Sequence, residues 1–273
     1  MPNIIVDKAL CTKCNICSSI CLMGIIKPAA DADFPCIQSA NENKCMLCGH
    51  CEAFCPAQAL TLDFLVEEKI PFIRGESCIE PERLALYMRS RRSIRHFRPE
   101  PVDKETIRQI LETARYAPSG GNSQTVQWLV IYDTEEVKKI AGLTVEWMRT
   151  VQNTPHPFAN YVSGIIKAWD LGFDPICRNA PHLVFAHLPV SDFVDDRTDA
   201  IIALSHFDVA APAFGVGCCW AGFIRMAVDS YPPLLEALAL PDKHKVGYGL
   251  FFGYPKYKVG ALARRQPIDV VWR

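Results

Sequence analysis

Residues 11–21 read CTKCNICSSIC and residues 45–56 read CMLCGHCEAFCP, so one spacing of four cysteines occurs twice near the start of the chain. In each copy, three cysteines stand at every third position and a fourth follows after three more residues. Three closely spaced thiolates can wrap one iron–sulfur cubane. They do not suit one tetrahedral zinc ion, because zinc sites usually combine CxxC pairs across a longer gap. The repeat therefore predicts two [4Fe–4S] clusters.

The overall composition excludes several classes of partner. The chain has 273 residues and a formal net charge of −1, which gives no bulk attraction to nucleic acid or to an anionic membrane. No run of about 18 apolar residues predicts a membrane span, and the first residues, MPNIIVD, lack the pattern of a secretory signal. We therefore expect a cytoplasmic protein with no nucleic-acid or membrane partner. In that compartment its thirteen cysteines are reduced thiols or metal ligands.

The stretch from residue 3 to about residue 62 resembles the bacterial ferredoxins that carry two clusters. Expected strands at Ile4–Val6, 24–26 and 59–62 flank the cysteine groups, as in those proteins. In that family the fourth cysteine of each group ligates the other cluster. The resemblance implies one cluster on Cys11, Cys14, Cys17 and Cys55, and another on Cys45, Cys48, Cys51 and Cys21. It defines a first domain over residues 1–62.

Two positions depart from the ferredoxin pattern. Leu22 stands where a proline follows the fourth cysteine in the second group, and Cys36 lies between the groups without an assigned role. We expect Cys36 to be a small buried side chain. Residues 63–81, which include Pro71, Gly75 and Pro81, predict a connecting segment that leads into a helix at residues 82–90 and a second domain over 82–273.

Five arginines crowd into residues 89–98, which read RSRRSIRHFR. The stretch alone is compatible with a solvated basic face, a nucleic-acid patch or a phosphate site. Arginine forks bind phosphate bidentately, and Ser93 adds a hydroxyl donor. The surroundings favour a phosphate site, because a helix expected from Asp103 ends in the turn-rich residues 117–122, APSGGN, and a strand is expected at 127–132.

At this point the chain from residue 82 onward resembles the nitroreductase family of FMN enzymes. The resemblance lies in RRSIRHF at 91–97, PSGGNSQ at 118–124, and an expected helix at 199–214 that leads into GVGCCWAGF at 215–223. It continues in GYP at 253–255 and RRQP at 264–267. The resemblance implies an α+β sandwich with an antiparallel sheet, assembled as a homodimer that binds FMN at the interface.

The resemblance also implies which residues contact FMN. Arg91, Arg92 and Ser93 bind its phosphate and ribityl chain, and Arg95 lies at the pyrimidine edge of the ring, where positive charge stabilises the reduced flavin. The other implied contacts are Pro118, Ser119 and Asn122 from the partner chain, Trp220, Ala221 and Gly222 along the ring, and Arg264 or Arg265 at the phosphate. No catalytic side chain is assigned.

Five aromatic residues lie in the middle of the second domain. They are Trp147, Phe158, Tyr161, Trp169 and Phe173. The family's variable middle segment often forms a lid over the flavin, and these residues fit either such a lid or core packing.

Together the two resemblances imply an FMN-dependent oxidoreductase. The expected role of the clusters is to relay electrons to FMN for reduction of an electron-poor small molecule, such as a nitroaromatic or a quinone. The electrons come from an external donor protein or from NAD(P)H. Two other readings stay open: a non-catalytic electron carrier or redox sensor, and a metal-stapled structural or nucleic-acid-binding protein.

Overall fold

The computed structural model describes residues 3–30, 33–63, 78–190 and 197–273. The chain forms two compact units. The first comprises residues 1–78 with the short turn 120–123, and the second comprises residues 79–119 and 124–273.

Two small antiparallel ribbons frame the first unit. Strand β1 (Ile4–Val6) pairs with β4 (Leu60–Leu62), and β2 (Ile26–Lys27) pairs with β3 (Cys36–Ile37). Between these strands lie the short helices α1 (Ile16–Ile20) and α2 (His50–Ala53) and the 3-10 helix η1 (Ser39–Lys44). Because β1 and β4 pair, the beginning and the end of the module lie side by side.

The apolar core of the first unit is small. Its buried members are Ile4, Cys17, Ile25, Ile26, Ile37, Leu60 and Leu62. A module of this size buries little apolar surface, so bonds between a metal centre and its ligands are a usual source of additional stability.

The expectation that Cys36 is buried was wrong. Cys36 is exposed on β3, whereas its neighbour Ile37 is buried. Successive side chains of a strand point to opposite faces, so only one of the two residues can face the small core. Ile37 takes that position.

The sheet of the second unit has four antiparallel strands in the order β5-β6-β8-β7, as the resemblance implied. They are β5 (Gln127–Ile131), β6 (His182–Pro189), β8 (His244–Gly253) and β7 (Gly217–Trp220). The pairing of β6 with β8 shifts register between Ala186 and His187. Strand β7 therefore lies at one edge of the sheet and pairs with the end of the long strand β8.

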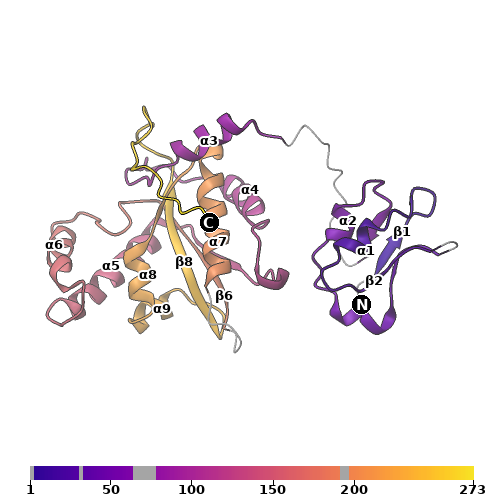
Figure 1. Cartoon of the computed structure of the whole chain (residues 1–273). Coiled ribbons are helices and arrows are strands. Elements are labelled where there is room, and N and C mark those ends of the chain that lie inside the picture. The colour runs from indigo at the N-terminus through magenta and orange to yellow at the C-terminus, as the bar shows by residue number, and fades with distance from the viewer. Residues whose placement is uncertain (1–2, 31–32, 64–77, 191–196) are drawn as a thin grey trace. The chain divides into compact units, whose positions relative to one another are not determined.

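Helices cover both faces of this sheet (Figure 1). One face packs against α4 (Lys104–Ala114) and α7 (Thr198–Ala210). The other packs against α5 (Thr134–Val151), α6 (Ala159–Asp170), α8 (Gly222–Val228) and α9 (Pro232–Ala237). Side chains of β6 alternate between these layers, with Val184 in the first and Phe185 in the second, and both are fully buried.

The three helices that the sequence predicts in the second unit, at 82–90, from Asp103 and at 199–214, begin close to the predicted residues. Asp103 caps α4 by accepting a hydrogen bond from Thr106 N at 2.8 Å, and Ile107 and Ile110 are buried on its inner face. Helix α3 (Pro81–Ser90) begins on a proline, which suits a first helical turn. Helix α7 continues as the 3-10 helix η3 (Ala211–Phe214), which ends at Gly215 with φ of 74° and leads into β7.

The aromatic residues of the middle segment divide between core and surface. Trp147 on α5 is buried in the core, and Phe158 and Trp169 pack against it. Tyr161 and Phe173 are 71% and 68% exposed. Core packing therefore accounts for three of the five. None of the described helices, α5 included, is long and apolar enough to cross a membrane.

Candidate cofactor sites

Two cavities in the first unit are each lined by four cysteines. One, the Cys45 site, is lined by Cys45, Cys48, Cys51 and Cys21. The other, the Cys11 site, is lined by Cys11, Cys14, Cys17 and Cys55. Each cavity takes three cysteines from one group and the fourth from the other group, which is the crossed arrangement that the ferredoxin resemblance implies.

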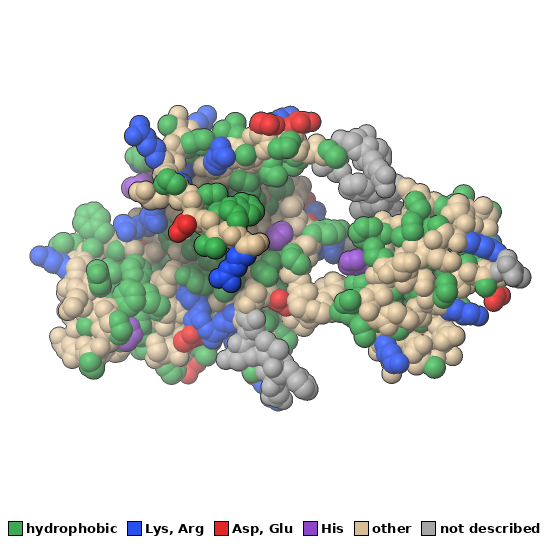
Figure 2. Space-filling view, viewed as in Figure 1, with side chains coloured by type: hydrophobic (Ala, Val, Ile, Leu, Met, Phe, Trp, Pro, Cys, Tyr) green, Lys and Arg blue, Asp and Glu red, His purple; other side chains and the backbone are tan. Residues whose placement is uncertain are grey.

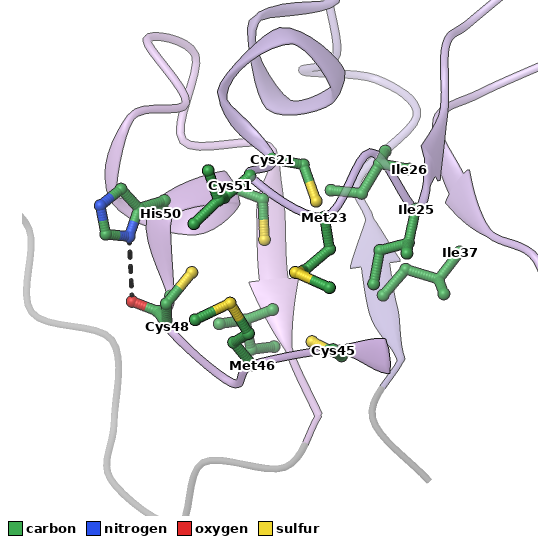
Figure 3. Close-up of a pocket in the computed structure, with 13 residues that line it drawn as sticks. Cys21, Met23, Ile25, Ile26, Ile37, Cys45, Met46, Cys48, His50 and Cys51 are labelled. Atoms are coloured by element: carbon green, nitrogen blue, oxygen red, sulfur yellow. Dashed lines mark hydrogen bonds between the residues drawn. The ribbon is translucent and has the colours of Figure 1, made fainter. Parts of the chain in front are cut away.

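The thiols of the Cys45 site face a common space with apolar walls (Figure 3). Met23 and Met46 reach over this space, and Ile25, Ile26 and Ile37 form its far wall. His50 lies at the rim, with Nδ1 3.3 Å from the carbonyl oxygen of Cys48. The empty volumes of the two cavities are similar, about 460 Å³ and 370 Å³ including space open to solvent, so both suit the same kind of group.

The two cysteine loops have the same backbone conformation. Lys13 and Leu47, each two residues after the first cysteine of its group, both have φ of 54°. Asn15 and Gly49, two residues further on, have φ of 60° and 75° and precede helices α1 and α2. Such left-handed residues are uncommon outside glycine and asparagine, and they tend to occur at functional sites. The sequence repeat is therefore also a structural repeat, and each copy surrounds one cavity.

Burial and repulsion from neighbouring thiolates make Cys17 and Cys51 resist ionisation. Burial is the largest cause that raises the pKa of Cys51 to about 11, and negative charge on Cys48 and Cys45 contributes to the same shift. Burial likewise raises the pKa of Cys17, with the same effect from Cys14 and Cys11. Thiolates gathered in such a cavity need positive charge among them, which the iron of a cluster provides.

The arrangement of the thiols fits a cluster better than a single ion. In the described ranges, no three His, Cys, Asp or Glu side chains converge as ligands of one metal ion. Each thiolate of a cubane binds a different iron, so a cluster needs its thiolates spread around a cavity rather than converging on a point. The donor set and the shape of both cavities suit [4Fe–4S] clusters.

In the second unit, the arginine segment is attached to strands β7 and β8. Ile94 N donates to Cys218 O at 2.9 Å, and Arg98 N donates to Tyr254 O at 2.9 Å. Gly217 permits this approach, because a Cβ there would lie 2.5 Å from the Ile94 side chain. The structure thus brings the RRSIR motif beside the CCW motif, as the resemblance to nitroreductases implies.

A buried carboxylate joins these two motifs. Asp208 on α7 is 6% exposed and accepts a hydrogen bond from Trp220 Nε1 at 3.0 Å. It also forms an ion pair with Arg91, with Oδ2 and Nη1 3.3 Å apart. The geometry of that pair does not make a hydrogen bond, so Arg91 Nη1 is buried with an unused donor. Burial raises the pKa of Asp208, and Trp220 and Arg91 oppose the shift.

Sequence reasoning missed Asp208. The expected helix at 199–214 was considered only as the element that leads into β7. A signal was present, because Asp208 has the helical spacing of Ala200, Ala203, Leu204 and Phe207, which form the buried face of α7. Buried carboxylates are rare unless they are paired, so such a residue predicts a partner.

Positive charge gathers around Cys219, the residue before Trp220. Burial and the negative charge of Asp208 raise the pKa of Cys219, whereas the charge of Arg95, a hydrogen bond with Ser93 and the charge of Arg178 lower it. Arg178 was not among the predicted residues. It has φ of 59°, in a turn where the Asp174 carboxylate accepts three backbone N–H groups at 2.8–2.9 Å. The edge of β7 therefore offers an environment suited to an anionic group.

The residues after Trp220 form a closely packed wall. The Trp220 and Tyr248 rings meet edge to face, with centroids 5.0 Å apart. Ala221 is buried and donates from N to Gly249 O at 2.9 Å. Gly222 opens α8, and a Cβ there would lie 3.4 Å from the Tyr248 hydroxyl.

The other predicted flavin contacts lie elsewhere in the chain. Pro118, Ser119 and Asn122 belong to the turn after α4, where Asn122 has φ of 54° and Ser119 Oγ accepts from Gln124 N at 3.1 Å. Arg92 is half-buried beside Arg91 in the sequence. Arg264 and Arg265 are exposed in the C-terminal segment, which has no regular secondary structure. The roles of these residues stay predictions.

Two known families match different parts of the chain. Residues 88–254 match the model of the nitroreductase family, and residues 39–61 match that of the 4Fe–4S binding domain. The fold and these matches define an oxidoreductase with an attached iron–sulfur motif. The chain belongs to the nitroreductase family.

Individual relatives share part of the chain. It is 28% identical over 167 residues to an Archaeoglobus fulgidus protein named as an NADH dehydrogenase/NAD(P)H nitroreductase, a match that covers 61% of this chain and 82% of that one. It is 30% identical to FMN reductase [NAD(P)H] of Bacillus subtilis, covering 60% of this chain and 62% of that protein. The solved structure of a Bacteroides fragilis nitroreductase with bound FMN has a TM-score of 0.55 and 20% identity, covering 68% of this chain and 94% of that one, and indicates a common fold.

Proposed function

We propose that the chain is an FMN-dependent oxidoreductase in which two [4Fe–4S] clusters relay electrons to FMN for reduction of an electron-poor small molecule. Nitroaromatics, quinones and related conjugated compounds are the acceptor class. One observation carries the proposal: two cavities, each lined by a crossed set of four cysteines, occur in the same chain as a nitroreductase-family sheet.

The chain's own residues have separate tasks in this proposal. Eight cysteine thiolates hold the clusters, and the apolar walls of the Cys45 site keep water away from one of them. Arg91, Arg92 and Ser93 bind the FMN phosphate and ribityl chain, and Arg95 offers its charge to the ring edge. When bound, the cofactors supply the redox chemistry, with single-electron transfer by the clusters and two-electron transfer to the acceptor by the flavin.

Two kinds of observation support FMN as the flavin. Relatives that match the second unit are named as FMN reductase or were solved with bound FMN. Within this chain, the unused donor at the buried Nη1 atom of Arg91 and the positive charges near Cys219 suit an anionic ligand. Arginine that is held in place before the ligand arrives is well suited to bind a phosphate.

The electron donor in this proposal is either an external redox protein or NAD(P)H. The names of two relatives refer to NAD(P)H. The iron–sulfur module favours a protein donor, because clusters accept single electrons whereas NAD(P)H delivers hydride.

The proposed assembly is a homodimer. On the face that Figure 2 shows, hydrophobic side chains lie exposed over the C-terminal segment. Ile268 and Trp272 are each 88% exposed, and Val271 is 79% exposed. Contiguous exposed apolar residues of this kind suit contact with another chain, and a second copy is the partner most common among such assemblies.

The test is the rate of flavin reduction with and without clusters. The protein is prepared without oxygen and mixed with a reduced one-electron donor protein, and flavin bleaching is followed. The double variant Cys14→Ser/Cys48→Ser removes one exposed ligand from each cavity, so we expect it to lose both clusters and to reduce its flavin at least tenfold more slowly. Cys36→Ser is the control, because Cys36 is exposed and lines neither cavity. Equal rates in the double variant and the wild type, or rapid reduction by NADPH that cluster loss leaves unchanged, would overturn the proposed relay.

A further inference from the structure

The two cluster sites have loops with matching backbone conformations, but the charged side chains around them differ. The inference rests on the proposed binding of two clusters. Because the cysteine loops have matching left-handed residues, each residue of one loop has an equivalent in the other, although Lys13 lines its cavity and Leu47 does not. Differences in side-chain charge at these positions therefore act on the two clusters unequally.

The first difference is a cation at the Cys11 site. Lys13 lines this cavity, and its ammonium lies 4.7 Å from the centroid of the Phe34 ring. Lys8 approaches the same ring at 5.8 Å. The equivalent of Lys13 in the other loop is Leu47, which has the same φ of 54° and no charge.

The second difference is a carboxylate at the Cys45 site. Glu52 follows the third cysteine of its group, and its Oε2 accepts a hydrogen bond from Leu62 N at 3.1 Å. Leu62 lines the cavity, so the carboxylate is held directly behind the cavity wall. The equivalent residue in the other loop is Ser18, whose neutral hydroxyl donates to Ile26 O at 2.8 Å.

Both differences favour an electron at the Cys11 site. Reduction adds a negative charge to a centre that already has four thiolate ligands. A nearby ammonium stabilises the added charge, whereas a nearby carboxylate opposes it. We propose that Lys13 and Glu52 make the Cys11 site the first to accept an electron and the Cys45 site the second.

Two other basic side chains lie at or near the Cys45 site. His50 lines the cavity, and its Nδ1 lies 3.3 Å from the carbonyl oxygen of Cys48. Lys44 precedes Cys45, but its ammonium donates to Asn41 Oδ1 at 3.0 Å and the residue does not line the cavity. Lys13 and Glu52 are therefore the two charges that the variants test.

The experiment is a redox titration of the full, cluster-loaded chain at pH 8, followed by electron paramagnetic resonance. We expect two reduction waves, with at least a tenfold preference of the first electron for one cluster, which corresponds to 59 mV for one electron. Lys13→Leu lowers the midpoint potential of the upper wave and leaves that of the lower wave unchanged. Glu52→Gln, which keeps an oxygen acceptor for Leu62 N, raises the midpoint potential of the lower wave. The double variant brings the waves together.

Lys44→Leu is the matched control, because it removes a charge close in sequence to a ligand but outside the cavity. It should move either wave by less than half the shift that Lys13→Leu causes. A single wave from protein with about eight irons per chain overturns the inference and leaves the proposed function standing. A shift of the lower wave by Lys13→Leu also overturns it. Protein with about four irons or with zinc overturns the two-cluster proposal itself.

Discussion

Asp208 is a single side chain that connects two segments more than a hundred residues apart in the sequence. It pairs with Arg91 of the arginine segment and accepts from Trp220 of β7. Asp208→Asn keeps an acceptor for Trp220 but leaves the arginine charge without its partner. Loss of one member of a buried pair costs about 3–5 kcal/mol. Arg91 is partly exposed, so we expect about 1–3 kcal/mol lower free energy of unfolding and weaker FMN retention.

Asp229→Asn is the control for this change. Asp229 also pairs with arginines, Arg197 and Arg225, but its side chain is 43% exposed. Exposed pairs contribute about 0–1 kcal/mol, so this variant should retain most of its stability and its FMN. Urea unfolding curves and the dissociation constant of FMN provide the measurements. If both variants behaved alike, Asp208 would have no special role in holding the site together.

At the scale of elements, the crossed ligation of the two cysteine groups predicts the iron content of paired cysteine variants. If Cys55 belongs to the Cys11 site, then Cys11→Ser/Cys55→Ser damages one cluster only, and about half of the iron remains. Cys45→Ser/Cys55→Ser damages both clusters, and little iron remains. The iron content of the purified double variants distinguishes the arrangements, because uncrossed ligation predicts the reverse order.

His182 connects three elements through a neutral ring. Its Nε2 accepts from Val102 N at 2.9 Å, and its Nδ1 lies 2.8 Å from Tyr132 O just after β5. Burial lowers the pKa of His182, and the contact with Tyr132 opposes the shift. Because the folded-state pKa lies below the usual value of about 6.5, the unfolded chain binds a proton more readily. The stabilisation is complete above about pH 6.5 and is lost as the pH falls below it.

We therefore expect His182→Asn to lower the free energy of unfolding at pH 7.5 by about 1–3 kcal/mol and to flatten its decline toward pH 5.5. His206 is exposed on α7, so His206→Asn should alter neither the free energy of unfolding nor its dependence on pH. All five tryptophans lie in the second unit, so their fluorescence during urea unfolding reports on this part of the chain. An unchanged pH slope in His182→Asn would contradict the argument.

Much of this architecture could be predicted from local patterns. The cysteine spacing predicted two cluster sites, the resemblance to two-cluster ferredoxins implied the two sets of four cysteines that line the cavities, and Asp103 marked the start of α4. Features that depend on tertiary packing were harder to predict from the sequence. Cys36 faces outward because Ile37 takes the place in the core. Asp208 and Arg178 reach the RRSIR and CCW motifs through α7 and through a turn that Asp174 holds, and no sequence motif marks either contact.

The proposed homodimer gives a prediction for the whole molecule. Deletion of residues 260–273 removes the exposed apolar side chains of Ile268, Val271 and Trp272. We expect the full chain to have twice the monomer mass of 30.5 kDa by light scattering, and the truncated chain to shift toward the monomer and to lose FMN. Trp272→Ala should produce the same shift to a smaller extent. A full chain that is monomeric at all concentrations would contradict the assembly.

The central claim is that one chain holds two iron–sulfur clusters and one flavin. The most direct measurement is the content of iron, acid-labile sulfide and FMN per chain after purification without oxygen. The account predicts about eight irons, eight sulfides and one FMN. Zinc without flavin, or FMN without iron, would contradict it.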